Sequence, residues 1–178
     1  MKKRRLIIKI IVLAATIAIL FAPLPFDHST RIENSVTIAR PPEAVFTYVT
    51  TPGNWPKWHP SSLAVSGATD HSLSLGETVT EDFRVAGRTG RVVWRVVEAA
   101  APHSWTIDGM IGNRAAGTVR YSLAARAGGT DFKREFVYHA PNLLFVVLNR
   151  LSIRAQIDAE SEQAVRQLKV VLESGPGS

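Results

Sequence analysis

Three polar side chains in the middle of the chain have the chemistry to act on a carbonyl compound: Glu81, Tyr121 and Arg134. Each lies in a strand-like run with apolar residues two positions away, and side chains two positions apart share one face of a strand. If that face points into a dry pocket, Glu81 or Tyr121 could exchange a proton while Arg134 holds an oxyanion. The alternative is structural: Glu81 and Arg134 as a buried ion pair, and Tyr121 as a core ring with one hydrogen bond. The catalytic residues, if the protein is an enzyme, are therefore unknown from the sequence.

Motifs for metal, cofactor or nucleophilic chemistry are missing from the sequence. The histidines, at positions 28, 59, 71, 103 and 139, have no metal-ligand spacing, and the chain has no cysteine. There is no nucleophile elbow, P-loop or dinucleotide fingerprint. His59 follows a predicted helical turn and has the simple role of a helix-end residue. We therefore expect no metal site and no cofactor.

The positive charge of the chain is concentrated at its N-terminus. The formal net charge is +6, from 21 basic and 15 acidic residues. Residues 1–26 contain five of the basic residues and no acid, which leaves residues 27–178 with a net charge of only +1. Nucleic-acid binding needs a basic surface on the domain itself, so we expect no nucleic-acid partner.

The N-terminal segment reads as a membrane anchor. Leu6 to Ala22 is apolar apart from Lys9 and Thr16, and a helix continued to Phe26 would be about 30 Å long, enough for the hydrocarbon core. A cleaved signal peptide is the alternative, but bulky residues and a proline stand where small residues are needed. We predict an uncleaved transmembrane helix over 1–26, with the basic end in the cytoplasm and the domain on the extracytoplasmic face of the cell membrane.

The remaining residues predict one α+β domain. Residues 27–34 read as a linker, residues 35–173 as the domain, and residues 174–178 as a disordered tail. The domain begins with a strand and two short helices, and it closes with one long helix after Pro141. Between them, six further strands are expected at 62–66, 77–85, 90–98, 104–111, 115–125 and 131–139. This order describes a curved antiparallel sheet of about seven strands wrapped around the C-terminal helix.

Aromatic residues gather on the face of the sheet that is expected to point inward. They could fill a core or line a ligand cavity, and the pattern alone leaves both open. The residues that we predict to contact a ligand are Trp58, Glu81, Phe83, Trp94, Trp105, Tyr121, Arg134, Phe136, Phe145 and Leu148.

Six consecutive apolar residues, Leu143 to Leu148, open the long helix. An amphipathic helix needs only three or four apolar positions in two turns. Either the sheet edge and the short helices enclose this turn, or Val146 and Val147 form an apolar lip at the cavity entrance, with Trp55 or Trp58 across it.

Four segments resemble a known family. They are Ile38–Phe46, Trp55–Pro60, Gly129–Arg134 and Leu168–Glu173, and together with the order of elements they resemble the START-like (helix-grip, Bet v 1-like) superfamily, in particular polyketide cyclase/dehydrase-type SRPBCC proteins. The resemblance implies a helix-grip fold with a deep, mostly apolar cavity and no fixed metal or cofactor. It also implies a lipid, polyketide or other hydrophobic molecule as the ligand. Because the family mixes enzymes with carriers and sensors, the resemblance does not fix the activity.

Two hypotheses follow from the sequence. The first is a membrane-anchored binding protein for a hydrophobic small molecule or lipid, held between the sheet and the C-terminal helix. The second is a polyketide cyclase/dehydratase-like enzyme that acts on an aromatic or polyketide precursor by general acid/base catalysis. The expected anchor favours the first, since a tether raises the effective concentration of a ligand dissolved in the bilayer. The oligomeric state is not predicted.

Overall fold

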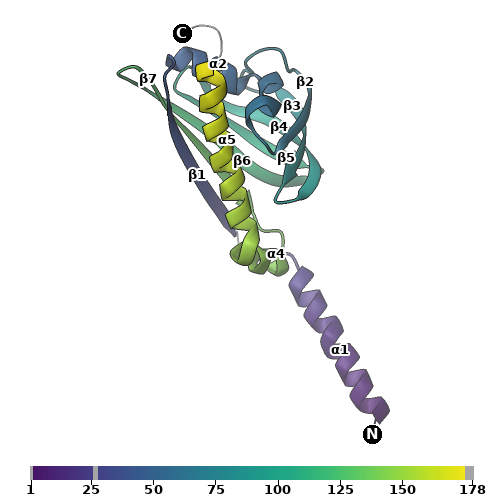
Figure 1. The fold of residues 1–178 in the computed structure, drawn as a ribbon. Helices are drawn as coiled ribbons and strands as arrows, with labels where there is room; N and C mark the ends of the chain where they lie inside the picture. The colour runs from purple at the N-terminus through teal and green to yellow at the C-terminus, as the bar shows by residue number, and fades with distance from the viewer. Residues whose placement is uncertain (1, 26–27, 175–178) are drawn as a thin grey trace.

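The computed structural model describes residues 2–25 and 28–174, which form an N-terminal helix and an α+β domain (Figure 1). The strands are β1 (Ser29–Ile38), β2 (Ser62–Gly67), β3 (Thr78–Val85), β4 (Arg88–Ala100), β5 (Ser104–Ile111), β6 (Arg114–Arg126) and β7 (Gly129–His139). The helices are α1 (Lys2–Phe21), α2 (Pro42–Thr50), the 3-10 turn η1 (Pro52–Asn54), α3 (Trp55–Trp58), α4 (Leu143–Leu148), the π-helical turn η2 (Asn149–Ile153) and α5 (Arg154–Ser174).

The seven strands form one antiparallel sheet in the order β1-β7-β6-β5-β4-β3-β2. Strands β2 to β7 follow one another as a meander, and β1 pairs with β7 at the edge. The sheet and the long C-terminal helix agree with the predicted architecture, whereas the N-terminal transmembrane helix that was part of that prediction does not.

Strand β1 begins at Ser29, inside the segment that the sequence suggested as a linker. Residues Ser29 to Asn34 pair with β7, from His139 to Arg134. Their polar character comes from the outward face, where Arg31 forms an ion pair with Glu135 at 3.1 Å, while Ile32 is buried on the other face. The polar composition of this segment therefore suggested a linker, although the segment is a strand whose charged side chains pair with those of β7.

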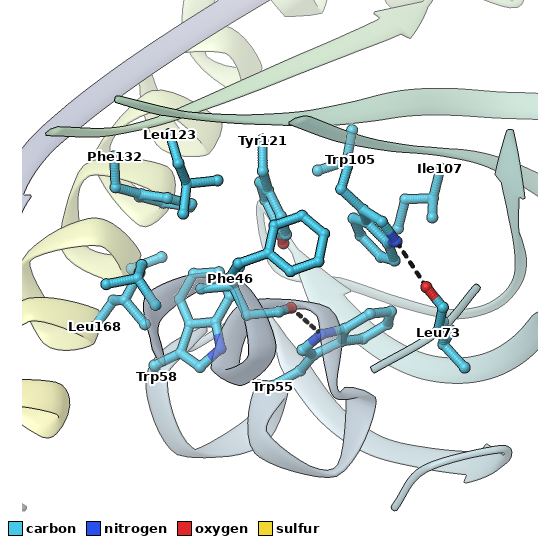
Figure 2. Packing of buried hydrophobic residues seen from close by; sticks show 14 of the residues in the cluster. Phe46, Trp55, Trp58, Leu73, Trp105, Ile107, Tyr121, Leu123, Phe132 and Leu168 are labelled. Carbon is cyan, nitrogen blue, oxygen red and sulfur yellow. Dashed lines mark hydrogen bonds between the residues drawn. The ribbon is translucent and has the colours of Figure 1, made fainter. Parts of the chain in front are cut away.

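Helix α5 covers the concave face of the sheet through one apolar stripe (Figure 1). The buried positions are Ile157, Ser161, Ala164, Val165 and Leu168, which recur at helical spacing. Figure 2 shows Leu168 facing Phe132 and Trp58 in the main core. Two buried indoles are hydrogen-bonded in this region: Trp105 Nε1 donates to the Leu73 carbonyl in the loop before β3 at 3.1 Å, and Trp55 Nε1 donates to the Val49 carbonyl of α2 at 2.9 Å (Figure 2).

Helix α1 corrects the prediction of a membrane anchor. The predicted helix ran to Phe26, which lies outside the described residues, but α1 ends at Phe21, just before Pro23. Its apolar part, Leu6–Phe21, rises only about 24 Å, against about 30 Å for the hydrocarbon core. No helix in the described part of the chain is long and apolar enough to span a membrane. The predicted transmembrane segment, and the single-pass placement with an extracytoplasmic domain, are therefore wrong.

The predicted long C-terminal helix is divided by the π-helical turn η2 into α4 and α5. Helix α4 has no buried residue, and Val147 is 43% exposed. Phe145 and Leu148 pack on one side, against a small cluster that includes Ile32, Tyr138 and Ile153. The apolar turn is therefore not enclosed on both sides. Residues 175–178 of the predicted tail lie outside the described residues.

The packing of α5 predicts unequal effects of truncation along the helix. Leu168→Ala should lower the free energy of unfolding by about 2–5 kcal/mol, because Leu168 is fully buried and its truncation leaves a cavity. Val170→Ala on the same helix is the control, since Val170 is 62% exposed, and its effect should stay within about 0.5 kcal/mol. Urea unfolding followed by tryptophan fluorescence measures both. Equal effects of the two variants would contradict the packing of α5 described above.

Candidate functional site

A cavity of about 470 Å³ lies between the concave face of the sheet and helices α3, α4 and α5. Strands β3, β4, β6 and β7 supply most of its wall, and α5 contributes Ile157, Glu160 and Ser161. The volume is in the range of small-molecule sites in proteins, and most of the lining is apolar. The cavity therefore has the size and chemistry to enclose a hydrophobic small molecule.

Eight of the ten side chains that the sequence indicated as ligand contacts line this cavity. They are Trp58, Glu81, Phe83, Trp94, Tyr121, Arg134, Phe136 and Phe145. The other two, Trp105 and Leu148, are not in its wall. Trp105 is fully buried and stacks on Tyr121, with ring centroids 5.4 Å apart, so it lies behind the wall. Leu148 packs in the small cluster beside α4. Contact of any of these residues with a ligand stays a prediction.

Arg134 places a positive charge in the wall of the cavity. It projects inward from β7, is only 6% exposed, and donates from Nη1 to Ser161 Oγ at 2.8 Å. Its Nε is buried and has no hydrogen-bond partner among the described residues. Burial lowers the pKa of Arg134, but a guanidinium stays protonated at neutral pH.

Glu81 is bound by an indole and not by the arginine. Trp94 Nε1 donates to Glu81 Oε2 at 2.7 Å. In the described part of the chain no ion pair joins Glu81 to Arg134, so the buried pair considered from the sequence is not formed. Burial raises the pKa of Glu81, while the bond from Trp94 and the more distant charge of Arg134 oppose that effect.

Tyr121 lies in an aromatic cluster at the inner end of the cavity. Its ring contacts Trp58, Trp105 and Phe132, and Figure 2 shows these rings converging from the sheet and α3. Burial raises the pKa of Tyr121 to about 12, so the phenol is protonated at neutral pH. A protonated phenol can donate a hydrogen bond but cannot serve as a base.

His59 is a cavity residue that sequence reasoning treated as a helix-end residue only. It follows α3, lines the cavity, and accepts a hydrogen bond at Nδ1 from the Ser61 amide at 3.3 Å. Its Nε2 is buried and has no hydrogen-bond partner among the described residues. Burial, and secondarily the charge of Arg134, hold the pKa of His59 well below 6.5, so the imidazole is neutral at pH 7. No sequence signal distinguished it, since the spacing of histidines only tests for metal sites.

Ser161 is a second residue that was missed, and here a signal existed. It is the polar member of the otherwise apolar stripe on α5, and it is 2% exposed. A hydroxyl at a core-facing position predicts a buried polar partner, which the structure identifies as Arg134.

The described residues contain no group of three His, Asp or Glu side chains placed to hold a metal ion. The polar atoms of the cavity belong instead to separate side chains in an apolar wall. Three of them, Trp58 Nε1, His59 Nε2 and Arg134 Nε, are buried without a partner among the described residues. Buried polar atoms are nearly always paired, so these three mark a place where a ligand oxygen or a water can bind.

The matches to known proteins agree with this geometry. Residues 29–173 match the family model described as polyketide cyclase/dehydrase and lipid transport. No curated protein sequence matches the chain.

Solved structures share the fold. The Zhui aromatase/cyclase from Streptomyces sp. R1128 is 15% identical and superposes with a TM-score of 0.65, over 82% of this chain and 94% of that one. A protein from Rhodobacter sphaeroides is 22% identical with a TM-score of 0.61, over 82% of this chain and 94% of that one. Ara h 8.0201 is 16% identical with a TM-score of 0.58, over 83% and 100%. At these identities the likeness establishes the fold alone.

The environment of His59 predicts a dependence of stability on pH. In the unfolded chain His59 takes up a proton near pH 6.5, whereas the folded protein excludes that proton until the pH is much lower. The contribution of His59 to the free energy of unfolding should therefore fall as the pH drops below about 6.5, by at most about 1.4 kcal/mol per pH unit. His59→Gln should remove this contribution. Urea unfolding at pH 7.5, 6.5 and 5.5 compares the two proteins, and every other titrating group is common to both. Parallel pH profiles for the two proteins would show that His59 is not kept neutral by burial.

Proposed function

The chain belongs to the polyketide cyclase/dehydrase and lipid transport family, and on that basis we propose that it binds a hydrophobic small molecule in the cavity between the sheet and α5. The observation that supports this most directly is an apolar cavity of about 470 Å³ whose wall includes buried polar atoms without partners. A fully packed core would have neither feature.

The apolar wall supplies most of the binding free energy in this proposal. Each Å² of apolar surface that a ligand removes from water contributes roughly 25 cal/mol. The aromatic rings of Trp94, Phe83 and Phe136 provide broad contact surfaces for such a ligand. Binding to the wall alone would be unselective in orientation.

The partnerless polar atoms would orient the ligand. Trp58 Nε1 and Arg134 Nε are donors, and so is His59 Nε2, because Nδ1 of this neutral imidazole accepts from the Ser61 amide and the ring proton is on Nε2. A buried polar atom without a partner costs about 1–3 kcal/mol, so a ligand oxygen that satisfies one recovers part of that free energy. The favoured ligand therefore has an apolar body and at least one polar group.

His59 favours a second candidate function, an acid–base enzyme acting on an aromatic or polyketide precursor. The neutral, buried imidazole carries its proton on the unpartnered Nε2, because Nδ1 accepts from the Ser61 amide. This N–H can donate to a ligand carbonyl oxygen while the carbon next to it gives a proton to the Glu81 carboxylate, which lines the same cavity. The enolate oxygen formed would lie in the field of the Arg134 charge. Tyr121 would serve only as a donor, because its phenol is protonated.

Filling the cavity should abolish binding without unfolding the protein. Ala116 lines the cavity on β6, and Ala116→Phe should weaken the binding of the neutral fluorophore N-phenyl-1-naphthylamine by about tenfold or more, by occupying its volume. Fluorescence titration measures this, and circular dichroism checks the fold.

Ala124→Phe is the matched control, because Ala124 is exposed on the same strand and does not line the cavity. It also accounts for fluorophore that binds to the exposed apolar side chains of α1, which both variants retain. Equal binding by the two variants would exclude the cavity as the binding site.

The enzymatic candidate is tested by proton exchange. In D2O the protein should speed the exchange of the methyl protons of 2-acetylnaphthalene, and Glu81→Gln should reduce the added rate by about 100-fold or more. Mass spectrometry follows the exchange. A binding protein without acid–base activity would bind the ketone and leave its exchange rate at that of buffer.

A further inference from the structure

The charged side chains on the two faces of β7 differ in whether they form ion pairs. On the outer face, Lys133 forms an ion pair with Glu33 at 2.8 Å, and Glu135 forms one with Arg31 at 3.1 Å. On the inner face, Arg134 has no carboxylate in contact with it among the described residues. The charged side chains on the outer face of β7 are therefore in ion pairs, whereas the buried charge of Arg134 is not.

The groups around Arg134 are neutral or already engaged. Its hydrogen-bond partner is the Ser161 hydroxyl, at 2.8 Å, and its guanidinium lies 5.5 Å from the ring centroid of Phe136. Tyr121 is protonated and His59 is neutral at pH 7. Glu81 is held by the Trp94 indole and forms no ion pair with the arginine in the described part of the chain. Glu81 and Glu160 place carboxylates in the same wall, but they accept hydrogen bonds from other groups, so no carboxylate contacts the positive charge of Arg134 among the described residues.

A buried charge without a carboxylate in contact is expensive, and arginine cannot avoid the penalty by losing its proton. A cation–π contact and a hydroxyl recover only part of the free energy of hydration. Such a side chain is retained at low cost to the fold only if something negative binds to it. The Nε of this guanidinium is also buried and has no hydrogen-bond partner in the described part of the chain, and the residue lines the cavity.

We propose that the ligand is an organic acid with an apolar body, whose carboxylate binds to Arg134 while its body lies against the aromatic wall. This deepens the proposed function and rests on it. A carboxylate matches the planar fork of a guanidinium with two parallel hydrogen bonds, which a neutral carbonyl or hydroxyl cannot do.

The rim of the cavity supports the same ligand class. Arg88 and Arg114 line the cavity from exposed positions, and neither forms an ion pair within the described residues. The Arg88 guanidinium lies 6.0 Å from the ring centroid of Phe145. A basic rim attracts an anion toward an apolar interior that it would otherwise enter slowly.

Decanoate and decan-1-ol form a matched pair of probes, because they share one apolar chain and differ in charge. The full-length protein at pH 7.5 is loaded with N-phenyl-1-naphthylamine, and each probe displaces it. Decanoate should bind at least about tenfold more tightly than decan-1-ol. Arg134→Met should weaken decanoate binding by about 10- to 100-fold and decan-1-ol binding by less than about threefold.

Arg134→Lys covers the case in which the methionine variant does not fold. It keeps the charge but loses the fork, so the preference for decanoate should persist at a reduced value. A preference unchanged in either variant would assign the anion to the rim arginines and overturn the proposal. Equal binding of the two probes by the native protein would overturn it as well, while leaving the cavity as a binding site. If neither probe displaces the fluorophore, or Ala116→Phe binds both probes like the native protein, the proposed function itself fails.

Discussion

The volume between the sheet and α5 is the constraint on which the rest of the structure depends. At one end of this space, Trp55, Trp58, Trp105 and Phe132 form one core cluster with residues from the C-terminal half of α5 and fill it. At the other end, α5 presents Ile157, Glu160 and Ser161 to the cavity, and these side chains leave open space between the helix and the sheet. The core and the cavity are thus two halves of one interior, and the size of the inward side chains decides which half is filled.

The boundary between the halves is where the polar groups lie. Arg134 reaches α5 at Ser161, one turn before the buried stripe continues as Ala164 and Leu168. Tyr121 and His59 lie on either side of Trp58 in the same layer. A polar group placed deeper in the filled half would be out of reach of a ligand, and one placed at the rim would be hydrated. At the boundary these groups are dry enough for strong electrostatic effects and still accessible to a ligand.

The fold could be predicted because the spacing of apolar residues within each strand and helix indicates which face is buried. Alternation along β3 to β7 and the stripe of α5 needed only a few residues each to be recognised, and the structure confirms both. The errors arose where a local pattern had two physical outcomes. The apolar run after Leu6 predicts a spanning helix only if the helix continues past Phe21, which Pro23 prevents. The polar run from Ser29 reads as a linker unless its charges find partners on β7.

The cavity residues were predictable as a set but not in their roles. Eight of the ten line the cavity because inward direction follows from alternation. Whether an inward aromatic fills space or borders it depends on the summed volumes of side chains from several elements, which no local pattern contains. Trp105 and Trp94 illustrate this, since both point inward and only Trp94 reaches the cavity. His59 was missed for a related reason: its importance comes from burial and from Arg134, which is 75 positions away in the chain.

The charge of Arg134 couples the two functions that the site supports. Burial is the main reason that the pKa of His59 is low, and the repulsion from Arg134 lowers it further. An anion bound at Arg134 would cancel that repulsion and raise the pKa of His59 toward its usual value. An enolate formed next to the imidazole is such an anion, so Arg134 and the Nε2–H of His59 would both stabilise its oxygen as negative charge develops there. A site that holds an organic anion would therefore also stabilise the formation of one, and the change from carrier to enzyme would require only a ligand with an acidic C–H within reach of the Glu81 carboxylate.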